Sequence, residues 1–160
     1  MTTFERWSVW LTSAVVAGTG FVYAWMKYLL VPVDAFAVVN HPLQPLVLKL
    51  HIVSAPLLVF VIGMITLRHV WPHYRALVPR GRRSGIVVAL MTVPMILTGY
   101  LVQVITNVGW LLAIVVAHLL LGIVYAVGLV LHQVAVRMTA SSPQPSVAEP
   151  DEVPSVVSPK

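Results

Sequence analysis

The chain has 160 residues, of which 59% are hydrophobic and 9% are charged, and its mean hydropathy is +0.91. A soluble domain carries about 25% charged residues, so this composition predicts an integral membrane protein. The chain contains no cysteine, which excludes thiolate-held metals, iron–sulfur clusters, covalently attached haem and disulfides. The net charge of +5 does not indicate a nucleic-acid partner, because the basic residues gather at one expected membrane boundary.

Four apolar runs are long enough to cross a bilayer. We expect an all-α integral membrane protein whose residues 1–138 form a four-helix transmembrane bundle surrounded by membrane lipid. The first run exceeds twenty residues and lacks a clear cleavage site, which favours a membrane anchor over a cleaved signal peptide. Residues 139–160 are rich in proline and serine and are expected to form a disordered tail. The expected spans are about 8–31, 46–70, 85–105 and 110–134.

The arginines set the expected orientation of the bundle. The segment from Arg68 to Arg83 holds five arginines and no acidic residue, whereas the connections at the opposite boundary are poor in positive charge. By the positive-inside rule, the arginine-rich loop is cytoplasmic. Four spans then place both termini in the cytoplasm. The second span is expected to end at Trp71-Pro72, because the residue before a proline disfavours helix.

Two of the expected spans each carry two histidines. His118 and His132 are fourteen residues apart, which returns to within about 40° of the starting direction on an α-helix. His51 and His69 are eighteen residues apart, which is about five whole turns. An imidazole in hydrocarbon is costly unless its nitrogens find partners, so these histidines form a functional-site hypothesis.

The second and fourth spans run in the same direction, so the four histidines are expected to form two facing pairs. His51 faces His118 near the outer side of the membrane, and His69 faces His132 near the cytoplasmic side. Two neutral imidazoles that approach one iron from two helices are what a b-type haem requires. The separations on the two helices differ by about 6 Å, so a single-haem version, with His51 and His118 alone, is the alternative.

A small residue follows each outer histidine by one helical turn. Ala55 follows His51, and Gly122 follows His118. A helix must be thin where a flat macrocycle lies against it, so these two positions are expected to contact the cofactor. Basic residues near each pair are candidates to neutralise the haem propionates; these are Arg68, Arg75, Arg137 and, on the outer side, Lys49.

A four-span chain with His118-x13-His132 on its last helix resembles the membrane-embedded dihaem b-type cytochromes, which include cytochrome b561-like proteins and the cytochrome b subunits of respiratory dehydrogenases and hydrogenases. The resemblance covers residues 46–137, and His51-x17-His69 departs from the family spacing. It implies two haem b groups, or one, with the four histidines as axial ligands. It also implies electron transfer across a bacterial inner membrane between the quinone pool and a partner subunit or periplasmic electron carrier.

Two other functions fit parts of the pattern. In a proton-relay or transporter subunit, the membrane histidines would be titratable sites, although the expected spans hold no aspartate or glutamate. A cofactor-free accessory or assembly subunit would use small residues such as Gly63, Gly85, Gly99 and Gly128 for packing, but it leaves the paired histidines unexplained. Electron transfer through haem is therefore the leading hypothesis.

Overall fold

The computed structural model describes residues 2–32, 34, 36–76 and 82–140. These residues form only helices and the connections between them, and four stretches are long and apolar enough to cross a membrane. The expected all-helical architecture, with four helices long and apolar enough to span a membrane, is thus confirmed for the described part of the chain. The helices are α1 (Thr3–Tyr28), α2 (Gln44–Ile65), the π-helical turn η1 (Thr66–Val70), α3 (Trp71–Arg75), α4 (Arg82–Val104) and α5 (Val108–Ala140).

Helix α1 begins five residues before the expected boundary because its first turn is capped. The Glu5 N–H donates to Thr2 Oγ1 at 3.2 Å, and the Thr2 N–H donates to Glu5 Oε2 at 2.8 Å, which is a capping box. Glu5 is only 5% exposed, and its Oε1 lies 3.4 Å from Nη1 of Arg68. The expectation that no span holds an acidic residue is therefore wrong at Glu5.

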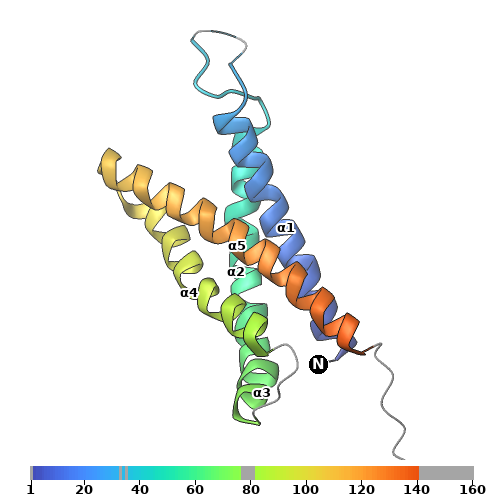
Figure 1. The fold of residues 1–160 in the computed structure, drawn as a ribbon. Coiled ribbons are helices and arrows are strands. Elements are labelled where there is room, and N and C mark those ends of the chain that lie inside the picture. Colours follow the sequence, from blue (N-terminus) through green and yellow to red (C-terminus); the bar gives the residue numbers. More distant parts are fainter. Residues whose placement is uncertain (1, 33, 35, 77–81, 141–160) are drawn as a thin grey trace, which may run out of the picture.

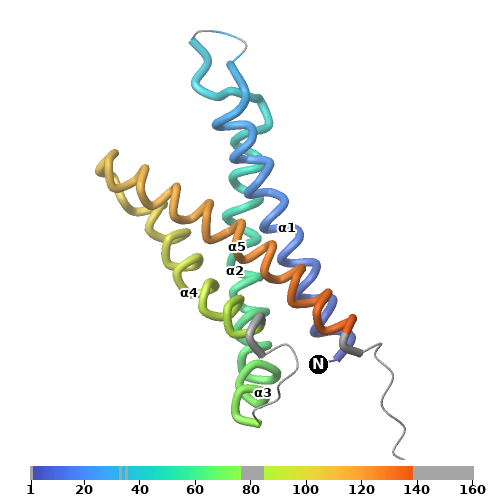
Figure 2. Tube along the Cα trace, in the orientation of Figure 1, coloured from blue at the N-terminus to red at the C-terminus, as the bar shows by residue number. Residues whose placement is uncertain are grey.

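The second span does not end at Trp71-Pro72, as expected, but continues to Arg75. The Trp71 N–H donates to the Thr66 carbonyl in the wider π-helical pattern, and Pro72 follows directly after this turn, in α3. Figure 2 follows this unbroken course from α2 into α3. His69 lies in the π-helical turn. The helix between His51 and His69 therefore does not consist of the five regular α-helical turns that the sequence predicts.

The four spans pair as two hairpins. Helix α1 packs along α2, and α4 packs along α5. Figure 1 shows that the hairpins cross near the beginning of α1 and the end of α5, which we call the terminal end. They diverge toward the connections at residues 29–43 and 105–107, which we call the hairpin end. Both ends of the described chain lie at the terminal end, as four antiparallel spans require.

The buried core lies where the two hairpins meet. Its members are at most 8% exposed and come from α1, α2 and α5: Val9, Leu58, Val61, Tyr125 and Leu129. A hydrogen bond of 3.0 Å between Ser13 Oγ and the Tyr125 hydroxyl joins α1 to α5 beside this core. The hairpins are therefore held together in their terminal half, and space between them opens toward the hairpin end.

The first two residues of the tail expected at 139–160 belong to α5, which continues through residues 139 and 140. The rest of that prediction, residues 141–160, lies outside the described residues.

Replacing Tyr125 by phenylalanine should lower the free energy of unfolding by about 0.6–1.7 kcal/mol, because the Ser13 hydroxyl loses its interhelical partner. Reversible unfolding in mixed detergent micelles measures this change. Tyr28→Phe is the control, since Tyr28 is 49% exposed and a surface substitution should change stability by no more than about 0.5 kcal/mol. Equal effects of the two substitutions would contradict the role of the Ser13–Tyr125 bond.

Candidate functional site

A cavity of about 690 Å³ lies between the two hairpins, on the hairpin-end side of the core. Its volume falls within the range of about 300–1,000 Å³ that is usual for ligand and cofactor pockets. All four spans contribute to its wall, which is mainly apolar. The polar groups within it are few, and two of them are the imidazoles of His51 and His118.

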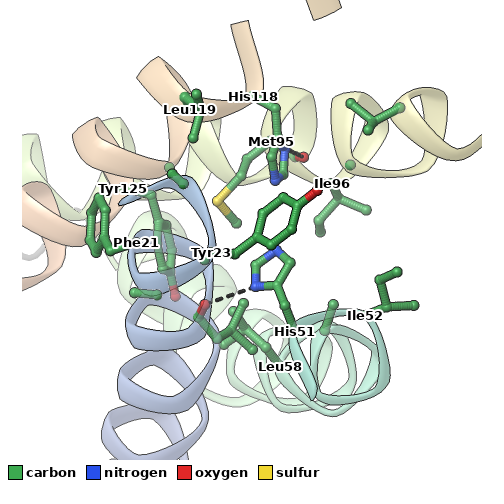
Figure 3. Close-up of a pocket in the computed structure, with 18 of the residues that line it drawn as sticks. Phe21, Tyr23, His51, Ile52, Leu58, Met95, Ile96, His118, Leu119 and Tyr125 are labelled. Atoms are coloured by element: carbon green, nitrogen blue, oxygen red, sulfur yellow. Dashed lines mark hydrogen bonds between the residues drawn. The ribbon is translucent and has the colours of Figure 1, made fainter. Parts of the chain in front are cut away.

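His51 from α2 and His118 from α5 point toward one another across this cavity (Figure 3). Their ring centroids are 6.3 Å apart, and the ring planes cross at 72°. Both side chains are half-buried. The structure thus brings together the outer histidine pair that the sequence predicts.

A hydrogen bond within its own hairpin orients each of these rings. His51 Nδ1 lies 3.0 Å from the Val16 carbonyl of α1, and His118 Nδ1 lies 3.1 Å from the Met95 carbonyl of α4. A carbonyl oxygen only accepts, so Nδ1 of each ring carries the proton and donates it. Nε2 is then the unprotonated nitrogen of each imidazole, with a lone pair that can bind a metal ion.

A threonine hydroxyl adds a second acceptor to each ring. Thr19 Oγ1 lies 3.3 Å from His51 Nδ1, and Thr98 Oγ1 lies 3.1 Å from His118 Nδ1. Each hydroxyl donates its own proton to a carbonyl of its helix, that of Val15 at 2.7 Å and that of Pro94 at 2.8 Å. The threonine oxygens therefore accept from the imidazoles, which fixes the same tautomer in both rings.

The glycine after each threonine leaves room for the imidazole. A Cβ on Gly20 would lie 3.0 Å from His51 Cε1, and a Cβ on Gly99 would lie 3.1 Å from His118 Cε1. Both distances are tighter than ordinary van der Waals contact. Only glycine therefore lets the facing helix approach each ring this closely.

The small residues predicted to contact a flat cofactor both line the cavity. Ala55 and Gly122 lie on its wall, one turn after His51 and His118. A Cβ on Gly122 would meet no atom within 4 Å, so the wall is open beside it. A flat ligand between the imidazoles can therefore lie against both helices.

The other two predicted ligands lie nearer the terminal end. The His69 ring lies 4.1 Å from the ring of His73, centroid to centroid, and His69 Nδ1 is buried without a hydrogen-bond partner among the described residues. His132 Cε1 lies 3.4 Å from where a Cβ on Gly85 would be, so this ring, like that of His118, occupies the space left by a glycine of α4. The pairing of His69 with His132 stays a prediction.

The residues around the outer pair fit a bis-histidine haem iron. Imidazole nitrogens bind transition-metal ions at about 2.0–2.1 Å, and the ring centre lies roughly 1 Å farther, so two rings on one metal ion have centres about 6 Å apart. The measured 6.3 Å agrees with this value. The Nδ1–H bonds to backbone carbonyls are those that metal-binding histidines generally make.

A metal ion held by protein ligands alone fits the described residues less well. No group of three or more His, Cys, Asp or Glu side chains in the described ranges is placed to hold one. Protein-ligated transition metals generally need three or four protein ligands. A haem iron would need only two protein ligands, because the macrocycle would supply the other four, and two facing imidazoles match that number.

Four residues of the site were not predicted from the sequence: Val16, Thr19, Met95 and Thr98. A signal for them exists, because the dipeptide Thr-Gly occurs only twice in the chain, at Thr19-Gly20 and at Thr98-Gly99. Each copy lies in the first helix of a hairpin whose second helix carries the histidine. The two hairpins thus use the same local pattern for the two halves of the site.

No family model, curated protein or solved structure matches this chain. The resemblance to b-type cytochromes therefore stays a prediction.

Gly20→Ala should lower the free energy of unfolding by about 1–3 kcal/mol, because the new methyl group displaces the His51 ring from a tightly packed position. Gly18→Ala is a matched control in the same helix, since a Cβ there meets no atom within 4 Å. That control should be neutral or stabilising by up to about 1 kcal/mol, owing to the higher helix propensity of alanine. Unfolding in mixed micelles that shows no difference between the variants would contradict the close contact.

Proposed function

We propose that this protein is a membrane b-type cytochrome that binds one haem b between His51 and His118 and transfers electrons through it. The observation that carries the proposal is the pair of facing imidazoles, 6.3 Å apart in an apolar cavity, each with Nδ1–H donated to a backbone carbonyl. A bound haem b would supply a one-electron couple at this place. Bis-histidine ligation suits electron transfer because both axial positions of the iron are filled.

The chain's own residues would bind and tune that couple. His51 and His118 offer their Nε2 lone pairs, and the carbonyls of Val16 and Met95 keep the rings in the required tautomer and make Nε2 more basic. The mainly apolar wall around the rings lowers the local dielectric constant, which would influence the reduction potential of a bound haem. No residue of the site is needed as a proton donor or nucleophile for electron transfer.

The proposal includes the further parts of the electron-transfer hypothesis, which are a second haem, the redox partners and the membrane. A second haem between His69 and His132 is the dihaem form of the same function. Exchange of electrons with the quinone pool, a partner subunit or a periplasmic carrier, and a place in a bacterial inner membrane, come from the resemblance to b-type cytochromes. The four apolar helices support a multi-pass membrane protein in contact with lipid.

The test is the dithionite-reduced minus oxidised spectrum of the purified protein, with haem quantified per chain. The native protein should show the sharp α band of low-spin haem b. His51→Ala and His118→Ala should each abolish it, because either substitution removes one axial ligand. His41→Ala is the control, since His41 lies in the connection between α1 and α2 and its Nδ1 accepts from the Leu43 N–H.

Retention of full haem content in both His51→Ala and His118→Ala would refute the site. His69→Ala and His132→Ala separate the two forms of the proposal. Unchanged haem content in these variants indicates a single haem, and loss of half of the haem indicates a second one.

A further inference from the structure

The cavity extends along α1 from the core to the hairpin end, and its two ends differ in chemistry. At the core end it is bounded by Leu58, Ile62 and Tyr125, whose hydroxyl is already hydrogen-bonded to Ser13. At the hairpin end it is bounded by Lys27. Lys27 is the one charged side chain among the described residues that line the cavity, so the cavity has an apolar end and a cationic end.

Two aromatic rings lie near the ammonium of Lys27, which is an exposed residue. Its Nζ lies 5.7 Å from the ring centroid of Tyr23 and 5.9 Å from that of Tyr28. Such cation–π contacts hold an ammonium in place without neutralising its charge. Lys27 forms no ion pair with a carboxylate of the described residues. Tyr100 and Gln103, from α4, line the cavity at the same end.

The distance of the Lys27 ammonium from the histidines also suits the carboxylates of a porphyrin held between the two imidazoles. Gly20, which contacts the His51 ring, lies midway between Ser13 and Lys27 in α1. Seven residues of helix separate it from each, which is about 10 Å. This distance is comparable with the reach from the centre of a porphyrin to the carboxylates on its edge.

We propose that the hairpin-end mouth of the cavity, formed by Lys27 with Tyr23, Tyr28, Tyr100 and Gln103, binds the carboxylate groups of the porphyrin. This inference rests on the proposed function and determines the direction in which the macrocycle lies. Its carboxylate edge faces the hairpin end, and its apolar edge faces Leu58 and Ile62. The opposite direction would place two carboxylates against an apolar wall, which is costly.

The basic residue named from the sequence for the outer side, Lys49, does not have this place in the described structure, and the arginines named for the inner pair stay a prediction. Lys49 does not line the cavity, and Arg68 lies outside it, beside Glu5. Lys27 was not predicted because its sequence position shows only that it ends an apolar span. Its place at the mouth depends on how far the two hairpins diverge.

The test compares haemin with haemin dimethyl ester, in which both carboxylates are blocked. Full-length protein from haem-deficient cells is titrated with each porphyrin, and binding is followed by the Soret absorbance. Lys27→Gln should weaken the binding of haemin roughly five- to tenfold, the size expected for a partly exposed charge-assisted contact. It should leave the affinity for the dimethyl ester unchanged. Lys27→Arg should retain the preference for haemin, and Lys49→Gln should bind both porphyrins as the native protein does.

Each contrary outcome has a separate meaning. If Lys27→Gln changes the affinity for both porphyrins equally, or for neither, the carboxylate site is refuted while haem binding by His51 and His118 stands. If the native protein binds neither porphyrin, the proposed function is refuted and this inference with it.

Discussion

The site depends on the hydrogen bond that each hairpin makes to its own histidine. An imidazole N–H without a partner is costly in a membrane, and here the Val16 carbonyl accepts from His51 Nδ1 while the Met95 carbonyl accepts from His118 Nδ1. A backbone carbonyl has two lone pairs, so it can accept an imidazole proton without giving up its place in the helix. Each hairpin is therefore a complete half-site, and Nε2 of each ring is left for a ligand that lies between the hairpins.

The packing of the hairpins decides where the two half-sites meet. The apolar core and the Ser13–Tyr125 hydrogen bond hold the hairpins together in the terminal half, and the divergence beyond them creates the cavity. Glycine at positions 20 and 99 lets each facing helix approach its ring, so the rings have little freedom to turn. The proposed carboxylate site at Lys27 and the space between the two imidazoles are consequences of the same divergence.

Much of this arrangement follows from patterns in the sequence, and the rest depends on contacts that such patterns do not encode. Length and hydropathy predict four spans, and the shared direction of the second and fourth spans predicts that His51 meets His118. The π-helical turn at His69 could not be predicted, because helical periodicity assumes a constant rise and rotation per residue. The carbonyls of Val16 and Met95 belong to the backbone, so no residue type marks them. The recurring Thr-Gly dipeptide is the signal in the sequence that points to both.

The crossed planes of the two imidazoles provide the most direct test of the account. The rings are at 72° to one another, so the two orbitals of a bound haem iron that interact with them would be nearly equal in energy. Electron paramagnetic resonance of the oxidised protein should therefore show a strongly anisotropic low-spin ferric signal at the content of one haem per chain. A rhombic signal, which parallel imidazole planes produce, would contradict the geometry of the site. Protein from haem-replete cells with no low-spin haem signal at all would contradict the proposed function.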